Sequence, residues 1–341
     1  MGRDGRSRDR RLAGNNTCAR CLRPAPGLGV GRATQDSSTG SRQDPPRGAL
    51  ARRTRLGRYT RAVPATQIAQ NLAFVNWTLL TGLALGSFAA VVMLRRRTTA
   101  TSGYLRFTMI CTLGFGVLAW ISDGALPASL GDSPVVIDPA WDAPRQTAIL
   151  LFTVLVAVAL VARRAGRRPA AAVELGALAA AVATLLFGAL AWGDGSLGSF
   201  SLLVQLAVVS AAIGGVFAAM ILGHWYLVTP KLPEAPLVLL AKALLAVVIV
   251  QVVLFWAWIA TGAGPADAAP FSSLTGPWAL FVWLRLIIGL IFPLVVCWAS
   301  VQTARTRSME SATGLLYINV GSIAAGTILA AGLYFGAGLL V

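Results

Sequence analysis

The sequence predicts an all-α, polytopic integral membrane protein, a bundle of about eight transmembrane helices. Hydrophobic residues make up 56% of the 341 positions and charged residues only 12%, about half the charged share of an ordinary soluble domain. Apolar runs recur from Leu72 onward, and roughly 20 such residues cross the hydrocarbon core. Lipid offers the backbone no hydrogen-bond partners, so these runs are expected to be helical.

The first 65 residues differ from the rest and are predicted to be a disordered leader. Residues 1–62 contain 15 arginines, four aspartates and a single aromatic residue, Tyr59, a composition that does not support a packed core. The bias towards Ala, Gly and Arg is typical of a GC-rich bacterial gene, in which such a leader can arise from a start codon assigned too early. The segment lacks the folded basic surface and stacking groups of a nucleic-acid-binding domain, and its one CxxC pair, Cys18 and Cys21, is a weak zinc signal.

Residues 66–341 are predicted to form the transmembrane domain. Small residues four positions apart indicate close helix packing, as at Gly82 and Gly86 and again at Gly332 and Gly336. Pro293 interrupts the seventh run and should free the carbonyl group of Gly289. The expected spans are 72–94, 105–121, 147–162, 170–192, 200–222, 235–260, 278–301 and 312–341.

The charges of the connections alternate, which predicts the orientation of the helices. Arginine or lysine marks the first, third, fifth and seventh connections, whereas aspartate marks the second, fourth and sixth, with Arg145 as the only base there. By the positive-inside rule the odd connections are cytoplasmic, so both termini lie outside. Five tryptophans gather towards the outer ends as an aromatic belt would: Trp77, Trp141, Trp192, Trp278 and Trp283.

Polar residues inside spans are the best functional indicators in such a sequence. An inner group lies towards the cytoplasmic ends: Glu174, His224, Tyr226, Lys242 and Asn319. An imidazole, a carboxylate and an amine on one side suggest a quinone headgroup site or a proton relay. Other readings stay open, since Lys242 can extend its amine to the interface, Glu174 can lie beside the Arg163–Arg168 connection, and His224 and Tyr226 can anchor the interface.

A second polar group lies in the outer half of the spans: Gln205, Gln251 and Arg285. The Arg285 side chain can extend outward or pair with Asp267, but burial beside either glutamine would indicate an anion or substrate site. The sequence indicates neither catalytic residues nor a metal site. One histidine cannot supply the two axial ligands of a bis-histidine haem, and no phosphate-binding GxxxxGK[ST] motif occurs.

Three hypotheses about function follow. The first is a cofactor-free membrane subunit of a bacterial electron-transfer complex, located in the cytoplasmic membrane, with a quinone-type site near His224 and other redox subunits as partners. Its eight helices and inner polar cluster are architecturally similar to the membrane anchors of the polysulfide-reductase type, without a matching motif. The second is a small-solute transporter or permease that uses Arg285 and Lys242, and the third is a structural or assembly protein.

Overall fold

The computed structural model describes residues 64–165, 170–229 and 232–341. Residues 1–63, which make up nearly all of the predicted leader and include Cys18 and Cys21, lie outside the described residues. Within the described ranges, eight helices are long and apolar enough to cross a membrane. The predicted multi-pass helical bundle is therefore confirmed, and a lipid bilayer is its expected surrounding.

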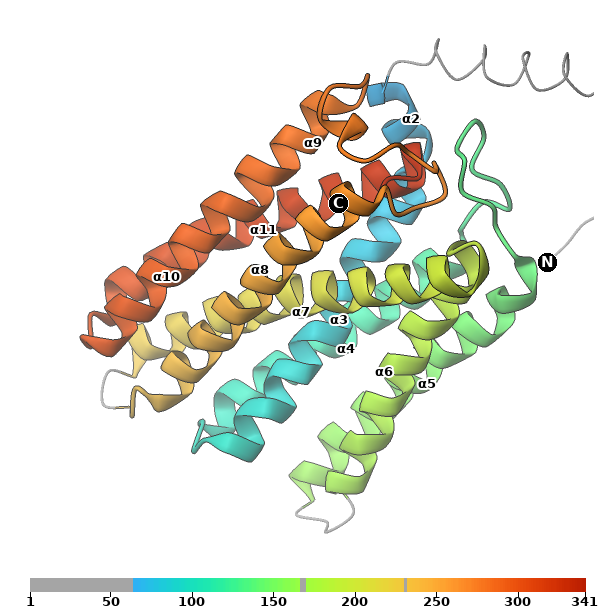
Figure 1. The fold of residues 1–341 in the computed structure, drawn as a ribbon. Helices are drawn as coiled ribbons and strands as arrows, with labels where there is room; N and C mark the ends of the chain where they lie inside the picture. The colour runs from blue at the N-terminus through green and yellow to red at the C-terminus, as the bar shows by residue number, and fades with distance from the viewer. Residues whose placement is uncertain (1–63, 166–169, 230–231) are drawn as a thin grey trace, which may run out of the picture. The chain divides into compact units, whose positions relative to one another are not determined.

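The helices follow the predicted spans closely, and Figure 1 shows their arrangement. The seventh span has three parts, namely α9, a π-helical turn (η3) and α10. The bounds are α2 Pro64–Gln70, α3 Leu72–Arg97, α4 Ser102–Gly124, α5 Asp142–Arg164, α6 Ala170–Trp192, α7 Gly195–Val228, α8 Ala235–Thr261, α9 Ala279–Leu286, η3 Ile287–Ile291, α10 Phe292–Arg305 and α11 Met309–Ala337.

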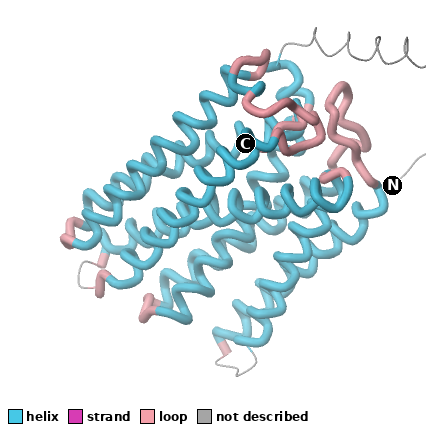
Figure 2. The backbone as a smooth tube through the Cα atoms, viewed as in Figure 1, coloured by secondary structure: helices cyan, strands magenta, loops and turns pink. Residues whose placement is uncertain are grey.

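Successive spans run in opposite directions, so their connections gather at two ends of the bundle (Figure 1). We call these the basic end, where α3, α5, α7 and α10 finish, and the acidic end, where α4, α6 and α8 finish. The longer loops of the described part lie at the acidic end (Figure 2). Helix α2 and the end of α11 also lie at the acidic end, as an even number of spans requires (Figure 1).

Helices α3 and α7 form the centre of the bundle and are its two most buried spans. They pack against each other at Gly82 and Gly86. A Cβ atom on Gly86 would collide with the Ser210 backbone carbonyl and lie 3.0 Å from the Gly214 Cα atom. The close approach predicted for this glycine pair is thereby confirmed, because only residues without side chains let the two backbones meet.

The second glycine pair has a different role from the one its spacing suggested. Gly332 and Gly336 receive the side chain of Ile68, and Gly336 also contacts the Trp278 ring. Ile68 belongs to α2, a seven-residue helix that the sequence did not indicate and that packs on α11. The pair therefore seats a short helix and an aromatic ring.

Pro293 changes the seventh span as its missing N–H predicts. Its position leaves the Gly289 carbonyl without a partner in the α-helical pattern, and the helix forms a π-helical turn at Ile287–Ile291. The Arg285 guanidinium donates to that carbonyl, with 3.2 Å from Nη1 to the oxygen. The interruption is thus compensated by a side chain of the same span.

Trp77 and Trp192 are not lipid-facing members of an aromatic belt. Trp77 is 0% exposed and Trp192 is 1% exposed, and their rings meet edge to face with centroids 4.7 Å apart. Trp283 does remain exposed, as an interfacial residue should. Both rings have polar partners inside the bundle, since the Trp77 indole donates to Asp123 and the Arg145 guanidinium lies over the Trp192 ring.

Candidate functional site

The basic end contains an apolar pocket of about 350 Å³ between α4, α7 and α11. His224 lies on its wall, and its Nδ1 atom is 3.3 Å from the hydroxyl group of Tyr317. Phe107 and Trp225 contribute aromatic surface. Since His224, Tyr317 and Phe107 are all exposed at the bundle surface, a ligand can reach this pocket from the surrounding bilayer.

Close helix contacts position the pocket residues. Gly103 lies against the Trp225 indole, where a Cβ atom would be 2.7 Å from the ring. Gly223 lies against Thr313 in the same way, with 2.7 Å from its would-be Cβ to the threonine hydroxyl oxygen. Tyr317 follows Thr313 by one helical turn on α11, so this contact brings its phenol group next to the residue after Gly223, which is His224.

The polar pair of the pocket suits a ligand with carbonyl oxygens. A neutral imidazole carries one N–H, so when Nδ1 accepts from the Tyr317 hydroxyl, Nε2 is the donor. With the reverse donation the phenol hydroxyl is the donor towards a ligand. In either arrangement one N–H or O–H group can bind a carbonyl, while the aromatic walls contact a ring, the usual design of a pocket for a small amphipathic molecule.

Glu174 does not line the His224 pocket but is part of an ion-pair cluster of its own. Its carboxylate accepts two hydrogen bonds from Arg163, at 3.1 Å from Nε and 2.8 Å from Nη2. It also pairs with Arg95 of α3. Glu174 is buried, at 2% exposure, so the three side chains fasten α3, α5 and α6 together at the basic end.

The remaining residues of the inner group have separate surroundings. Tyr226 is buried and donates to the backbone carbonyl of Pro233, which ties the end of α7 to the next connection. Lys242 is exposed on α8. Asn319 is fully buried and donates to the Cys297 sulfur at 3.0 Å, while its Oδ1 atom has no hydrogen-bond partner among the described residues. Of the inner group, only His224 lies on the aromatic pocket.

The two glutamines of the outer group bind backbone and indole groups. Gln205 donates to the Val341 carbonyl at 2.7 Å and accepts from the Trp258 indole at 3.3 Å. Gln251 donates to the Val208 carbonyl at 3.3 Å. These contacts join α7 to α8 and to the last residues of the chain, and none of them involves Arg285.

Arg285 is a buried cation, with 2% exposure. Within the described residues, no carboxylate oxygen lies within 4.0 Å of it, Asp267 included, and its Nε atom has no hydrogen-bond partner. Its Nη1 atom lies close to Gly326 of α11 as well as to the Gly289 carbonyl. An unpaired guanidinium inside a membrane bundle is costly, which makes it a functional candidate.

A buried polar network at the acidic end was not foreseen. Asp123 accepts from the Trp77 indole and from Arg145 Nε, both at 2.7 Å. Arg145 also pairs with Asp142 at 2.8 Å and lies over the Trp192 ring, 4.7 Å from its centroid. Its signal in the sequence was that Arg145 is the only base among the acidic connections.

Among the described residues, no group of three or more histidine, cysteine, aspartate or glutamate side chains is arranged to hold a metal ion. Cys111 and Cys297 are free thiols. Comparison of the sequence with models of known protein families and with curated proteins gives no match. The pockets and polar groups of the bundle itself are therefore the features that indicate a function.

Proposed function

We propose that this protein is a membrane subunit of a bacterial electron-transfer complex, and that it binds a quinone headgroup in the pocket of His224 and Tyr317. The observation that carries the proposal is the imidazole–phenol pair, 3.3 Å apart, on the wall of an apolar pocket. A quinone needs a donor for a carbonyl oxygen, aromatic or aliphatic walls for its ring, and an entrance from the lipid phase. The pocket supplies all three.

In this proposal the protein lies in the bacterial cytoplasmic membrane, with the basic end in the cytoplasm. Electrons reach or leave the quinone through redox subunits that dock on the bundle, because His224 and Tyr317 bind and orient a ring but store no electrons. His224 and Tyr317 hold the carbonyl oxygen and can exchange a proton with it.

Binding of a short-chain quinone to the full-length protein in lipid nanodiscs tests the proposal. The variant Tyr317→Phe removes only the hydroxyl group, and His224→Leu removes the imidazole. Each should weaken binding by roughly 2- to 10-fold, the value of one hydrogen bond. Lys242→Leu is the matched control, since it removes a polar group at the basic end outside the pocket, and its affinity should equal that of the wild type.

When the two pocket variants are combined, their losses of binding free energy should be less than additive, because His224 and Tyr317 contact each other. Equal quinone affinity of wild type, Tyr317→Phe and His224→Leu would remove the proposal. So would the absence of quinone from lipid extracts of the purified protein together with the absence of any copurifying redox subunit.

A second candidate function is favoured by Arg285, namely transport of a small anionic solute. Its buried guanidinium lacks a carboxylate partner in the described part of the chain and adjoins a π-helical turn, a feature that is frequent at functional sites. Uptake of radiolabelled acetate, lactate and phosphate into liposomes tests this candidate. Arg285→Met should abolish uptake and Arg305→Gln should leave it unchanged. Uptake no faster than in protein-free liposomes would exclude it.

A further inference from the structure

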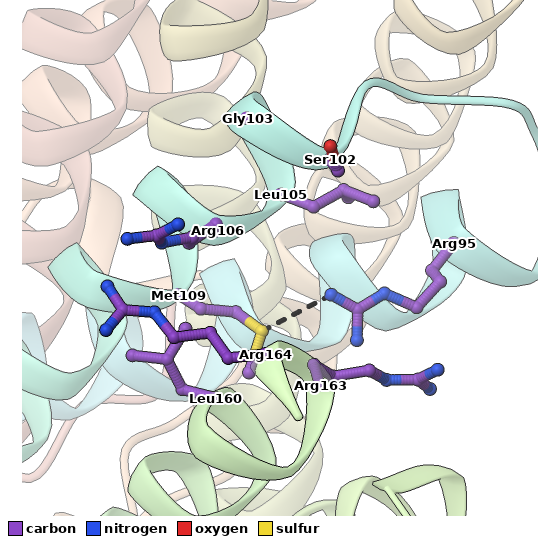
Figure 3. Close-up of a pocket in the computed structure, with 9 residues that line it drawn as sticks. All are labelled: Arg95, Ser102, Gly103, Leu105, Arg106, Met109, Leu160, Arg163 and Arg164. Carbon is purple, nitrogen blue, oxygen red and sulfur yellow. Dashed lines mark hydrogen bonds between the residues drawn. The ribbon is translucent and has the colours of Figure 1, made fainter. Parts of the chain in front are cut away.

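Four arginines surround a second cavity at the basic end, which the first turns of α4 also line (Figure 3). The cavity has a volume of about 370 Å³ and is lined by Arg95 of α3, Arg106 of α4, and Arg163 and Arg164 of α5. In the view of Figure 3, Arg106 and Arg164 extend to one side of Met109, whereas Arg95 and Arg163 lie on the other. Three helices thus contribute cations to one cavity.

The positive charge of this arginine pocket is only partly compensated. Glu174 binds both Arg95 and Arg163, so one carboxylate is shared by two guanidinium groups. Arg106 and Arg164 have no ion pair within the residues that the structure describes. Four cations against one anion leave a strong preference for a negatively charged ligand, and the exposed side of the pocket leaves an entrance for it.

The floor of the pocket is apolar. Leu105, Met109 and Leu160 line it, and Met109 is 1% exposed. Arg95 Nη2 lies 3.4 Å from the Met109 sulfur, so its guanidinium rests on this floor (Figure 3). An apolar floor beneath a cationic rim matches a molecule whose anionic group is attached to a hydrocarbon part.

The position of the arginine pocket agrees with a lipid ligand. Its arginines belong to the last turns of α3 and α5 and the second turn of α4, which is the depth of lipid headgroups at the basic end. Arg96 and Arg97 are exposed in the same turn of α3 but do not line the cavity. The arginine pocket is thus distinct from the exposed arginines elsewhere at the basic end, because its four arginines line one cavity.

We propose that the arginine pocket binds the phosphate group of an anionic phospholipid from the leaflet at the basic end. Guanidinium groups bind phosphate through two parallel N–H···O bonds, and basic pockets between transmembrane helices suit such headgroups. Glu174 positions Arg95 and Arg163, and Arg106 and Arg164 supply the uncompensated charge. The glycerol and upper acyl carbons lie against Leu105, Met109 and Leu160.

Native mass spectrometry of the full chain released from nanodiscs tests the proposal. The nanodiscs contain phosphatidylcholine with one tenth of phosphatidylglycerol or cardiolipin. The wild type should retain the anionic lipid, and the double variant Arg106→Gln, Arg164→Gln should retain on the order of tenfold less. The matched control is Arg97→Gln, Arg305→Gln, which removes two exposed arginines of the same end outside the pocket and should retain as much as the wild type.

A second arm separates a lipid from free phosphate, since the same arginines could bind either. Delipidated protein in detergent is titrated with phosphatidylglycerol or with inorganic phosphate, and its thermal midpoint is recorded. A rise with the lipid alone supports the proposal. A rise with inorganic phosphate and none with the lipid would overturn it in favour of a soluble phosphate ligand. Equal lipid retention by wild type and pocket variant, or equal loss in the control variant, would overturn it as well.

Discussion

At the residue scale, the bundle treats its two most buried arginines in opposite ways. Arg145 is bound by Asp123 and Asp142 and covered by the Trp192 ring. Arg285 has one backbone carbonyl and, within the described residues, no acid partner. A charge inside a membrane bundle usually pairs with another charge, and a buried charge without such a partner is a functional candidate, so the same residue type indicates two different roles here.

Replacing Arg145 with methionine should destabilise the protein strongly. The change leaves the Asp123 carboxylate buried, and of its two hydrogen-bond donors only the Trp77 indole remains. Breaking a buried ion pair costs about 3–5 kcal/mol. Unfolding in mixed detergent micelles measures this loss in the free energy of unfolding. Asp132→Asn, an exposed acid of the same loop region, should have no effect, and the double change Asp123→Leu, Arg145→Met should recover most of the loss. A single variant as stable as the wild type would show that the pair contributes nothing.

Replacing Arg285 with methionine should have the opposite effect and stabilise the protein. Methionine fills similar space without the desolvation cost of an unpaired guanidinium, so the free energy of unfolding should rise by on the order of 1–4 kcal/mol. Lys242→Met, which removes an exposed cation from another span, should leave it unchanged. Destabilisation by Arg285→Met would mean that the bond to the Gly289 carbonyl is structural, and it would weaken the case for transport.

At the element scale, the helices associate through small residues at their contacts and through side chains that hydrogen-bond to backbone carbonyl groups. Lipid is as apolar as leucine, so no hydrophobic force draws two spans together, and van der Waals packing has to do so. Gly86 and Gly214 provide it between α3 and α7. The π-helical turn between α9 and α10 shows the other device, in which Arg285 and Ser322 bind carbonyl groups of the seventh span.

Gly86→Val should therefore separate the two central helices. Its side chain would meet the backbone of Ser210 and Gly214, which cannot move aside, and overpacking of this kind costs about 1–3 kcal/mol or more. Gly114→Ala in α4 is the control, because no atom lies within 4 Å of its would-be Cβ, and alanine should raise helix stability by up to about 1 kcal/mol. Thermal unfolding in the same detergent should give a lower midpoint for Gly86→Val than for Gly114→Ala. Equal midpoints would contradict the close packing of α3 and α7.

At the scale of the whole molecule, the number and order of spans could be predicted from the sequence. An apolar run of sufficient length has one stable form in lipid, so hydropathy alone marked all eight helices. The short helix α2 was missed because seven residues give no hydropathy signal. Pro293 predicted an interruption at this place in the seventh span, but not that it would be a π-helical turn.

The candidate site could be predicted only in part, for a physical reason. Spans are apolar on their lipid-facing and their inward faces alike, so the sequence does not say which polar residues share a face. His224 was therefore identified while its partner Tyr317 was not, and Glu174 was grouped with His224 although it binds Arg95 and Arg163. Neighbouring helices, which the structure supplies, decide such groupings.

The eight-span threading predicts on which side of the membrane each end of the bundle, and so each site, lies. If all four native cysteines are replaced, single cysteines at Ala165 and Ala269 should lie on opposite faces, since these residues belong to the basic and the acidic end. By the positive-inside rule, an impermeant maleimide should label Ala269→Cys in intact cells and Ala165→Cys only after permeabilisation. Thr99→Cys, in the first connection of the basic end, is the control that should behave as Ala165→Cys does. Labels on both ends in intact cells would disprove the eight-span threading. The reverse pattern would keep the spans but place the arginine pocket and the His224 pocket in the outer leaflet, where a cytoplasmic redox partner could not reach them.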